Sequence, residues 1–464
     1  MSRLSRLLVP GAAVLLAAGC AVGPNYKRPT VPTATKYKEV NGWTPSEPAD
    51  VLSRGPWWNI FGDQVLDDLE KQIDISNQNV LAAAAAVEQS RALVREAEAD
   101  FWPTISVSGG QSFTASGGRP VQSIKSAAGT VNWSLDIWGQ IRRTVEGQEA
   151  SAQATAAALA AAELSAQTDL ATDYFELRAQ DQLERLLTDI VAADQRALDI
   201  AKARYKAGVA YKADVLSAET EVLTAQTQKI NAGITRATLE HAIAVLIGRP
   251  PTEFSLMQTG LASTVPTVPP GVPSTLLERR PDIAEAERQI AAANAQIGVA
   301  ISAFFPSLTL TGSDQYSGLR LGKLIRASNQ IWAIGPELAE TLFNGGLRVA
   351  QVAEARAAYR ENVANYRQTV LSDFGQVEDD IASLRILSKQ SVLETQLVKD
   401  ARESETLTLN QYKAGTVPYS SVITAQTTRL DAEETALSVQ LNQFTSSVGL
   451  IEALGGGWNA SQLK

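Results

Sequence analysis

The feature of this sequence that most constrains its fold is a short turn that occurs twice. The same four residues, Tyr-Lys-Ala-Gly, end one long helical stretch at 205–208 and another at 412–415, which is 207 positions later. Glycine leaves a helix through a left-handed conformation without steric cost, so each turn predicts a helix C-cap followed by a second helix running back. The arm before the first turn has neither Gly nor Pro over the 60 residues 148–207, or about 90 Å of helix. The sequence therefore predicts two long helical hairpins rather than one ordinary globular domain.

The segments that flank the two turns repeat as well. Phe-Trp-Pro-Thr at 101–104 matches Phe-Phe-Pro-Ser at 304–307, and Gly-Gln-Ile-Arg at 139–142 matches Gly-Gly-Leu-Arg at 345–348. Two halves of about 200 residues thus share one plan, which is the sign of a duplicated unit. We expect the two halves to pack side by side.

Four β-strands are predicted where the hydrophobic period changes from 3.6 to 2. Alternating apolar and polar residues predict strands at 104–114, 126–137, 307–316 and 329–338. Each is about ten residues long, the length that crosses a bilayer, although a two-layer soluble sheet is the alternative. Four strands cannot close a membrane barrel, because the smallest barrels have about eight. We therefore expect subunits to share one barrel: two chains give roughly 8 strands, and three give roughly 12, which begin to leave room for a passage.

The long arms carry apolar residues at alternating spacings of four and three, which predict a coiled-coil seam. The seam residues are Leu170, Tyr174 and Leu177, then Leu183, Leu187 and Ile190 in the first half, and Val370, Phe374, Val377, Ile381 and Leu384 in the second.

Before the arms, Trp57 and Trp58 directly follow a proline-punctuated lead from Val22 to Pro56. The paired tryptophans suit either a membrane-interface belt or a core anchor, and we favour the anchor.

A secretory leader is predicted at the start of the sequence. Arg3 and Arg6 precede an apolar run at 7–18 that is too short to span a bilayer as a helix. The small residues before Cys20 resemble the bacterial lipoprotein signal, which implies cleavage before Cys20 and its acylation with a lipid such as palmitate. Ala21 follows, rather than the aspartate of an inner-membrane retention signal, so the outer membrane is favoured. An unmodified signal-peptide cysteine is the alternative; since the chain has one cysteine, no disulfide within it can form.

Composition and motifs argue against an enzyme. His241 is the only histidine, so neither a Ser-His-Asp nor a Cys-His arrangement is available, and no metal site is predicted around it. Met1 and Met257 are the only methionines, which argues against thioether binding of copper or silver. The formal net charge of −9 provides no basic field for nucleic acid. We predict no catalytic residues and no cofactor beyond the lipid on Cys20.

Several local motifs together resemble the outer membrane factor family, specifically the lipoprotein branch of TolC-like proteins of the OprM/NodT type. They are Cys-Ala-Val-Gly-Pro-Asn-Tyr at 20–26, Trp-Trp at 57–58 with Phe61, Leu-Glu-Arg-Arg-Pro-Asp-Ile at 277–283, Ile-Gly at 297–298, Phe-Phe-Pro at 304–306 and Leu-Gly-Gly-Gly-Trp at 454–458. The resemblance implies a mostly α-helical homotrimer with a 12-stranded outer-membrane β-barrel, four strands per chain, above a periplasmic α-helical barrel and an equatorial region. It also implies the exit duct of a tripartite efflux pump, whose partners are outer-membrane lipid, a periplasmic membrane-fusion adaptor and an inner-membrane RND transporter.

The resemblance and the patterns together predict the organisation of the chain. The ranges are a signal peptide at 1–19, an extended equatorial segment at 20–62, a helix at 63–102, a barrel hairpin at 103–138, a helical hairpin at 139–248, an equatorial Pro-rich linker at 249–273, a helix at 274–305, a second barrel hairpin at 306–343, a second helical hairpin at 344–454 and a tail at 455–464. Pro281 and Asp282 suit the first turn of a helix. Two other functions stay open: a periplasmic coiled-coil lipoprotein or adaptor, and an exit duct for another export system.

The two glycine turns are the predicted periplasmic gate and adaptor-binding tip. Arms of nearly equal length put both turns at one distance from the barrel, and few contacts resist opening at helix ends. In the TolC-like family, acidic residues just past the second turn narrow the aperture, whereas Ser421 and Thr424 stand at the matching positions here. The residues predicted to line the tip are Tyr205, Gly208, Lys212, Asp214, Tyr412, Gly415, Tyr419, Ser421 and Thr424. Plain helix caps and solvated charge are the alternative interpretation.

Overall fold

The computed structural model describes residues 21–31, 37–39, 56–115, 117, 120–268 and 276–463. Cys20 and the predicted signal peptide at 1–19 lie outside the described residues. The chain divides into two compact units. Unit 1 comprises Met1–Val31, Ala85–Ala157 and Ala284–Thr369, and unit 2 comprises Pro32–Ala84, Ala158–Ile283 and Val370–Lys464.

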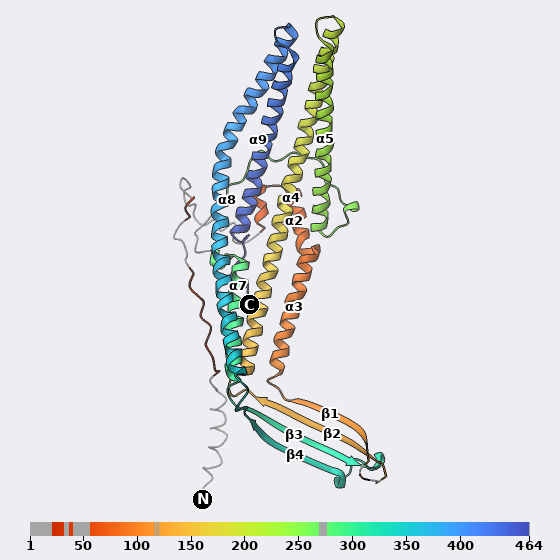
Figure 1. Cartoon of the computed structure of the whole chain (residues 1–464), viewed down its shortest axis with the longest axis vertical. Helices are drawn as coiled ribbons and strands as arrows, with labels where there is room; N and C mark the ends of the chain where they lie inside the picture. Colours follow the sequence, from red (N-terminus) through yellow and green to blue (C-terminus); the bar gives the residue numbers. More distant parts are fainter. Residues whose placement is uncertain are drawn as a thin grey trace. The chain divides into compact units, whose positions relative to one another are not determined.

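Unit 1 contains one antiparallel sheet of four strands, which Figure 1 shows side by side. The strands are β1 (Thr104–Thr114), β2 (Gln122–Leu135), β3 (Ser307–Gly318) and β4 (Gln330–Ala339), in the spatial order β1-β2-β3-β4. Thr104 lies opposite Asn132, and Ser307 lies opposite Ala339. The four predicted strands are confirmed, with β2 beginning and ending slightly earlier than predicted. Strands β1 and β4 form the two edges of the sheet, one from each half of the chain.

The helices repeat in length as closely as the turns repeat in sequence. The first half contains α3 (Gln78–Ala99), α4 (Gln140–Lys206) and α5 (Lys212–Leu246), with 22, 67 and 35 residues. The second half contains α7 (Pro281–Ser302), α8 (Leu347–Ala414) and α9 (Tyr419–Ala453), with 22, 68 and 35 residues. The duplication is confirmed, and Pro281 begins α7 as predicted. Short 3-10 helices are η3 (Trp57–Phe61), η4 (Pro251–Glu253), η6 (Leu321–Lys323), η7 (Ala327–Asn329) and η8 (Ala460–Gln462).

Two helices that the sequence predicted as continuous are interrupted. The predicted helix at 63–102 consists of α2 (Gln64–Ser76) and α3, with a break at Asn77. The Asn77 side chain accepts hydrogen bonds from the backbone N–H groups of Asn79 and Val80, and it donates to the Leu246 carbonyl at 2.8 Å. Asparagine thus caps a new helix here, because its side chain competes with the helical backbone. The predicted helix at 274–305 is likewise split, into α6 (Leu276–Arg279) and α7, because a residue before proline disfavours helical conformation.

The core of unit 2 forms where the seams of the long helices meet the aromatic residues of η3. Trp57 and Trp58 are buried, so they anchor the core rather than form a membrane belt. The Phe175 ring lies 4.8 Å from the Phe61 ring and 4.7 Å from the Phe444 ring, centroid to centroid. The buried seam residues are Leu170, Tyr174, Leu177, Leu187, Ile190, Val370, Val377 and Ile381, with Phe374 and Leu384 packed against them. The predicted coiled-coil seam is therefore the packing face.

No helix among the described residues combines the length and apolar character required to cross a membrane.

Candidate functional site

The two glycine turns close in the same way. Gly208 and Gly415 have φ angles of 75° and 81°, in the left-handed region that favours glycine. Past the first turn, the Val209 N–H donates to the Arg204 carbonyl at 3.1 Å, and past the second the Thr416 N–H donates to the Gln411 carbonyl at 3.0 Å. Both are Schellman-type caps, which satisfy the last carbonyls of each long helix.

The tip of the second hairpin is built around two tyrosines. Tyr412 and Tyr419 are 2% and 1% exposed, and their rings meet edge to face with centroids 5.2 Å apart. Among the described residues, neither hydroxyl has a hydrogen-bond partner. Burial raises the pKa of both phenols. This pair joins Val422 and residues of α4 and α5 in a small apolar cluster.

Arg204, from the first hairpin, holds this tip in place. Its guanidinium carbon lies 4.8 Å from the centroid of the Tyr412 ring, and Nη1 donates to the carbonyls of Tyr412 and Lys413, each at 2.9 Å. Sequence reasoning missed this residue. The available signal was a difference between the repeats, because the position equivalent to Arg204 in the second half is Gln411.

The other predicted tip residues lie in different surroundings. Tyr205 is 47% exposed, and Lys212 is exposed. Asp214 accepts a hydrogen bond from the Tyr211 N–H at 3.4 Å, so its carboxylate lies at the positive end of α5. Ser421 and Thr424 line a groove of about 420 Å³ between α8 and α9. The structure thus brings Tyr412 and Tyr419 together and leaves Tyr205 and Lys212 in solvent; the role of these residues in a gate stays a prediction.

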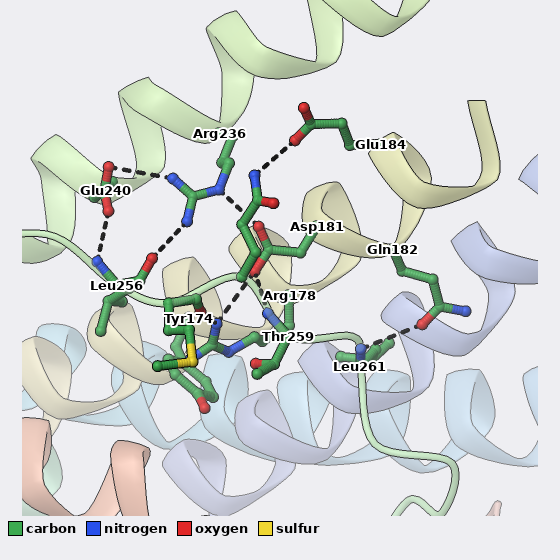
Figure 2. Close-up of polar contacts among 12 residues, drawn as sticks. Tyr174, Arg178, Asp181, Gln182, Glu184, Arg236, Glu240, Leu256, Thr259 and Leu261 are labelled. Atoms are coloured by element: carbon green, nitrogen blue, oxygen red, sulfur yellow. Dashed lines mark hydrogen bonds and ion pairs between the residues drawn. The ribbon is translucent and has the colours of Figure 1, made fainter. Parts of the chain in front are cut away.

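Below the first tip, four charged side chains form a buried network between α4 and α5, shown in Figure 2. Asp181 accepts from Arg178 Nη1 at 3.1 Å and from Arg236 Nε at 2.6 Å, while Arg236 Nη1 also donates to Glu240 at 3.2 Å. The Asp181 side chain is fully buried, and that of Arg178 is nearly so. We call Arg178, Asp181, Arg236 and Glu240 the clasp. Its charges can be buried because each carboxylate faces a guanidinium.

The clasp binds the main chain of the segment 255–261, which we call the strap. Figure 2 shows the strap crossing beside both helices. The main-chain contacts are Arg178 Nη1 to Met257 O at 2.7 Å, Arg236 Nη2 to Leu256 O at 2.7 Å, Leu256 N to Glu240 Oε1 at 2.6 Å and Thr259 N to Asp181 Oδ2 at 3.0 Å. The strap belongs to the linker between the two halves, so the clasp attaches this linker to the first hairpin.

In unit 1, the residues that follow Cys20 in the chain are attached to the junction between β2 and α4. The Val22 N–H donates to the Trp138 carbonyl at 3.0 Å, and Arg143 Nη2 donates to the Asn25 side chain at 2.8 Å. Trp138 stacks on Phe305 with a centroid distance of 4.7 Å. The start of the described chain is therefore held beside aromatic residues next to the sheet.

A pocket of about 270 Å³ in unit 2 collects acidic residues from three helices: Asp169, Asp380 and Glu452. Burial raises the pKa of all three carboxyl groups, that of Asp380 to about 7. Within the ranges that the structure describes, no group of three or more His, Cys, Asp or Glu side chains is arranged to hold a metal ion.

Comparison with known families decides what this architecture is. The family model described as outer membrane efflux protein matches residues 69–249 and 272–456, both halves of the chain. The chain belongs to the outer membrane efflux protein family. Members of this family are transport channels rather than enzymes, so an outer-membrane exit duct is the function of the fold described above. Family membership also argues against the periplasmic coiled-coil adaptor.

Individual relatives of this outer membrane efflux protein match it over almost its whole length. The probable efflux pump outer membrane protein TtgC of Pseudomonas putida is 28% identical, over 95% of this chain and 93% of the relative. The solvent efflux pump outer membrane protein SrpC of Pseudomonas putida is 29% identical, over 98% of this chain and 99% of the relative. Nodulation protein T of Rhizobium leguminosarum bv. trifolii is 27% identical, over 98% of each.

Solved structures share the fold. The outer-membrane channel OprN superposes with a TM-score of 0.87 at 25% identity, covering 95% of this chain and 100% of that one. CusC superposes with a TM-score of 0.84 at 23% identity, covering 94% of this chain and 100% of that one. At this identity, the likeness supports the fold alone.

Proposed function

We propose that three copies of this efflux protein form the exit duct of a tripartite RND-type pump, joined to a periplasmic membrane-fusion adaptor and an inner-membrane RND transporter. The observation that carries the proposal is the four-stranded sheet with β1 and β4 at its edges. Unpaired strand edges in lipid leave backbone groups unsatisfied, so copies must pair their edges. With an even number of strands, β1 of the next copy meets β4 in antiparallel orientation. Three copies give roughly 12 strands and a passage.

The relatives' names support the pump assignment. TtgC and SrpC are named as outer membrane proteins of efflux pumps, and SrpC as that of a solvent pump. We propose small molecules as cargo, conducted passively without a substrate pocket. Deleting the gene and scoring growth on a panel of drugs, solvents, dyes and metals tests this; an unchanged panel would favour an exit duct for another export system.

We also propose that Cys20 carries the lipid anchor. The aromatic junction at Trp138 and Phe305 holds the chain within two residues of Cys20, so acyl chains there would enter the leaflet beside the strand ends. One acyl chain binds a bilayer only marginally, so two or three are expected. Mass spectrometry of the purified N-terminus tests the anchor, with Cys20→Ser as the control. An N-terminus that begins at Met1 or Ser2 without lipid would contradict it.

The oligomeric duct is tested on protein extracted from outer membranes. Native mass spectrometry should give three times the chain mass, and the same sample should form conducting pores in planar bilayers. A monomer without conductance would refute the proposed duct. The gate at the two glycine turns is part of the proposal, since the buried tyrosine pair and Arg204 join the two hairpins at their ends.

A further inference from the structure

The connection between β3 and β4 is basic in a protein that is acidic overall. This connection, residues 319–329, which we call the outer loop, contains Arg320, Lys323 and Arg326 and no acidic residue, whereas the whole chain has a formal net charge of −9. The three basic side chains are exposed. Within the part of the chain that the structure describes, none of them forms an ion pair. A group of cations without internal partners attracts anions.

Apolar side chains are exposed between these cations. Leu319, Leu321 and Ile325 are 61%, 70% and 76% exposed. Leu324, by contrast, is buried, and Asn329 Nδ2 donates to two carbonyls of the loop at 2.8 and 3.1 Å. The outer loop is therefore folded around Leu324 and Asn329, and this fold presents apolar and cationic side chains together on the outside.

The pairing register shows which face of the sheet carries Lys125, the nearest basic residue of β2. Lys125 lies opposite Gly318 and Val131 lies opposite Ile105, so alternation places Lys125 on the same face as Ile105. That face is apolar and the opposite face is rich in hydroxyl groups. The apolar face carries Ile105, Val107, Val131, Ile334 and Leu338, and the other carries Thr104, Ser106, Ser108, Thr309, Thr311 and Ser313. In a membrane barrel the apolar face meets lipid.

The outer loop folds onto this apolar face. A Cβ added at Gly318 would lie 3.1 Å from Asn329 Nδ2 and 3.6 Å from a methyl group of Leu324. Because Gly318 is paired with Lys125, that Cβ position belongs to the apolar face. Lys125 Nζ also donates to the Leu319 carbonyl at 3.3 Å. The cations of the loop and Lys125 thus gather at one end of the lipid-facing side.

Aromatic residues mark the level of this end in the membrane. Phe113 and Trp332 are 70% and 69% exposed and belong to the apolar face by the same alternation. Aromatic girdles flank the apolar band of membrane strands at its interfaces. Because β3 follows α7 and β4 precedes α8 along the chain, the outer loop joins the strand ends away from both helices. The nearest acidic side chain on this face, Asp314, already accepts from Gln330 Nε2 at 2.8 Å.

We propose that the outer loop and Lys125 bind the phosphate groups of a phosphorylated, acylated glycolipid in the outer leaflet, while Leu319, Leu321 and Ile325 contact its acyl chains. Guanidinium groups match phosphate oxygens in pairs, and cations next to an apolar surface suit a lipid whose phosphates lie at the interface. The inference rests on the membrane barrel of the proposed function and deepens it by naming a lipid partner.

Lipid binding to the purified protein tests the site. The protein is extracted from outer membranes, delipidated in detergent and titrated with diphosphoryl lipid A, and native mass spectrometry gives the bound fraction. The variant that combines Arg320→Gln, Lys323→Gln and Arg326→Gln should need roughly tenfold more lipid A for half-saturation, because it removes the cations that meet the phosphates. Leu321→Ser with Ile325→Ser should weaken binding roughly fivefold, because these side chains contact the acyl chains.

A matched control removes the same charge from exposed positions on α4 and α8. It combines Lys202→Gln, Lys389→Gln and Lys399→Gln, and it should bind lipid A like the parent. Two further probes identify the source of the phosphate. Lipid A without its phosphates should bind the parent roughly tenfold more weakly, and inorganic phosphate at the concentration of the lipid should not displace lipid A.

The outcomes separate this inference from the proposed function. In a sample that is trimeric and conducts, parent-like binding by the outer-loop variant, undiminished binding of dephosphorylated lipid A, or displacement by inorganic phosphate overturns the lipid site and leaves the duct intact. Equal losses in the outer-loop variant and the matched control also overturn it, because net charge alone would then drive binding. A sample that is monomeric and does not conduct overturns both.

Discussion

The two hairpin tips have the same turn sequence but opposite surroundings. Tyr412 of the second hairpin is 2% exposed, whereas the equivalent Tyr205 of the first is 47% exposed. Tyr419, the first residue of α9, is 1% exposed, whereas Lys212, the first residue of α5, is exposed, as is its neighbour Tyr211. The first hairpin has a further attachment lower down, where the clasp binds the strap. Duplication thus preserved the backbone of the turn, and the contacts around each copy diverged. The second tip buries its tyrosines, whereas the first exposes its own and contacts the second through Arg204.

The largest effect is expected from breaking the clasp of the first hairpin. Asp181→Ala would leave Arg178 and Arg236 buried without their shared carboxylate, and loss of one partner from a buried ion pair costs about 3–5 kcal/mol. We expect that loss in denaturant unfolding followed by circular dichroism in detergent, with faster hydrogen exchange in the strap. Asp189→Ala, at an exposed position of the same helix, should change stability by no more than about 0.5 kcal/mol. Equal losses in both variants would show that the clasp does not hold the hairpin.

The next effect concerns the tyrosines of the second tip. Tyr412→Ala or Tyr419→Ala should cost about 3 kcal/mol through the cavity each leaves, and should raise the conductance of the isolated channel. Tyr205→Ala and Tyr211→Ala should cost about 0.5 kcal/mol or less and leave conductance unchanged. Tyr412→Phe and Tyr419→Phe should behave like the parent, because neither hydroxyl has a partner within the described residues. Hydrogen exchange at the tips measures the loss of stability, and single-channel recording measures the conductance. A raised conductance in Tyr205→Ala or Tyr211→Ala would place the gate at the first tip instead.

A smaller, pH-dependent effect is expected between the hairpins. Asp194 on α4 accepts from Gln426 Nε2 on α9 at 2.7 Å, and Arg429, Glu221 and Glu405 lie nearby. Burial raises the pKa of Asp194 to about 6, above its ordinary value of 3.8. The folded state therefore holds this proton more tightly, so stability from Asp194 is present in acid and is lost as pH rises through about 6, by on the order of 2 kcal/mol.

Asp194→Asn should flatten this part of the stability profile between about pH 4 and pH 7. Thermal unfolding at a series of pH values measures it. Asp199→Asn, an exposed neighbour on α4, should keep the parent profile. If Asp194→Asn keeps the stability profile of the parent, the pH dependence of stability comes from other carboxylates.

The smallest effect tests the part that the two tips share. Gly208→Ala and Gly415→Ala should each cost about 1 kcal/mol, because both positions have positive φ. Gly233→Ala and Gly375→Ala, which lie inside α5 and α8 with open space around them, should instead stabilise by about 0.5–1 kcal/mol. Thermal unfolding compares the four, and unequal costs at the two turns would show that surroundings also affect the turn backbone.

The local elements of this fold could be predicted because local residues determine them. The glycine turns, the proline-bounded strands and the seam from Leu170 to Leu177 each depend on spacing within one segment. The break at Asn77 could not, since its side chain is fixed by a carbonyl of Leu246, far away in sequence. The clasp left a signal that went unused: Asp181 continues the four-three spacing of the seam, and a carboxylate on a packing face requires a partner. The asymmetry of the two tips left little signal in the sequence, because the four turn residues are identical in both. The neighbouring helices decide how deeply the tyrosines of each tip are buried.

The strap also provides a place for a chemical label. Met257 is 83% exposed, while its carbonyl accepts from Arg178 at 2.7 Å. It is one of two methionines in the sequence, and the other, Met1, belongs to the predicted leader. A methionine-selective reagent would therefore attach a single fluorophore to each mature chain, at a backbone position fixed by two helices. Energy transfer between such dyes on neighbouring copies would report the diameter of the proposed trimeric tube without any substitution in the sequence.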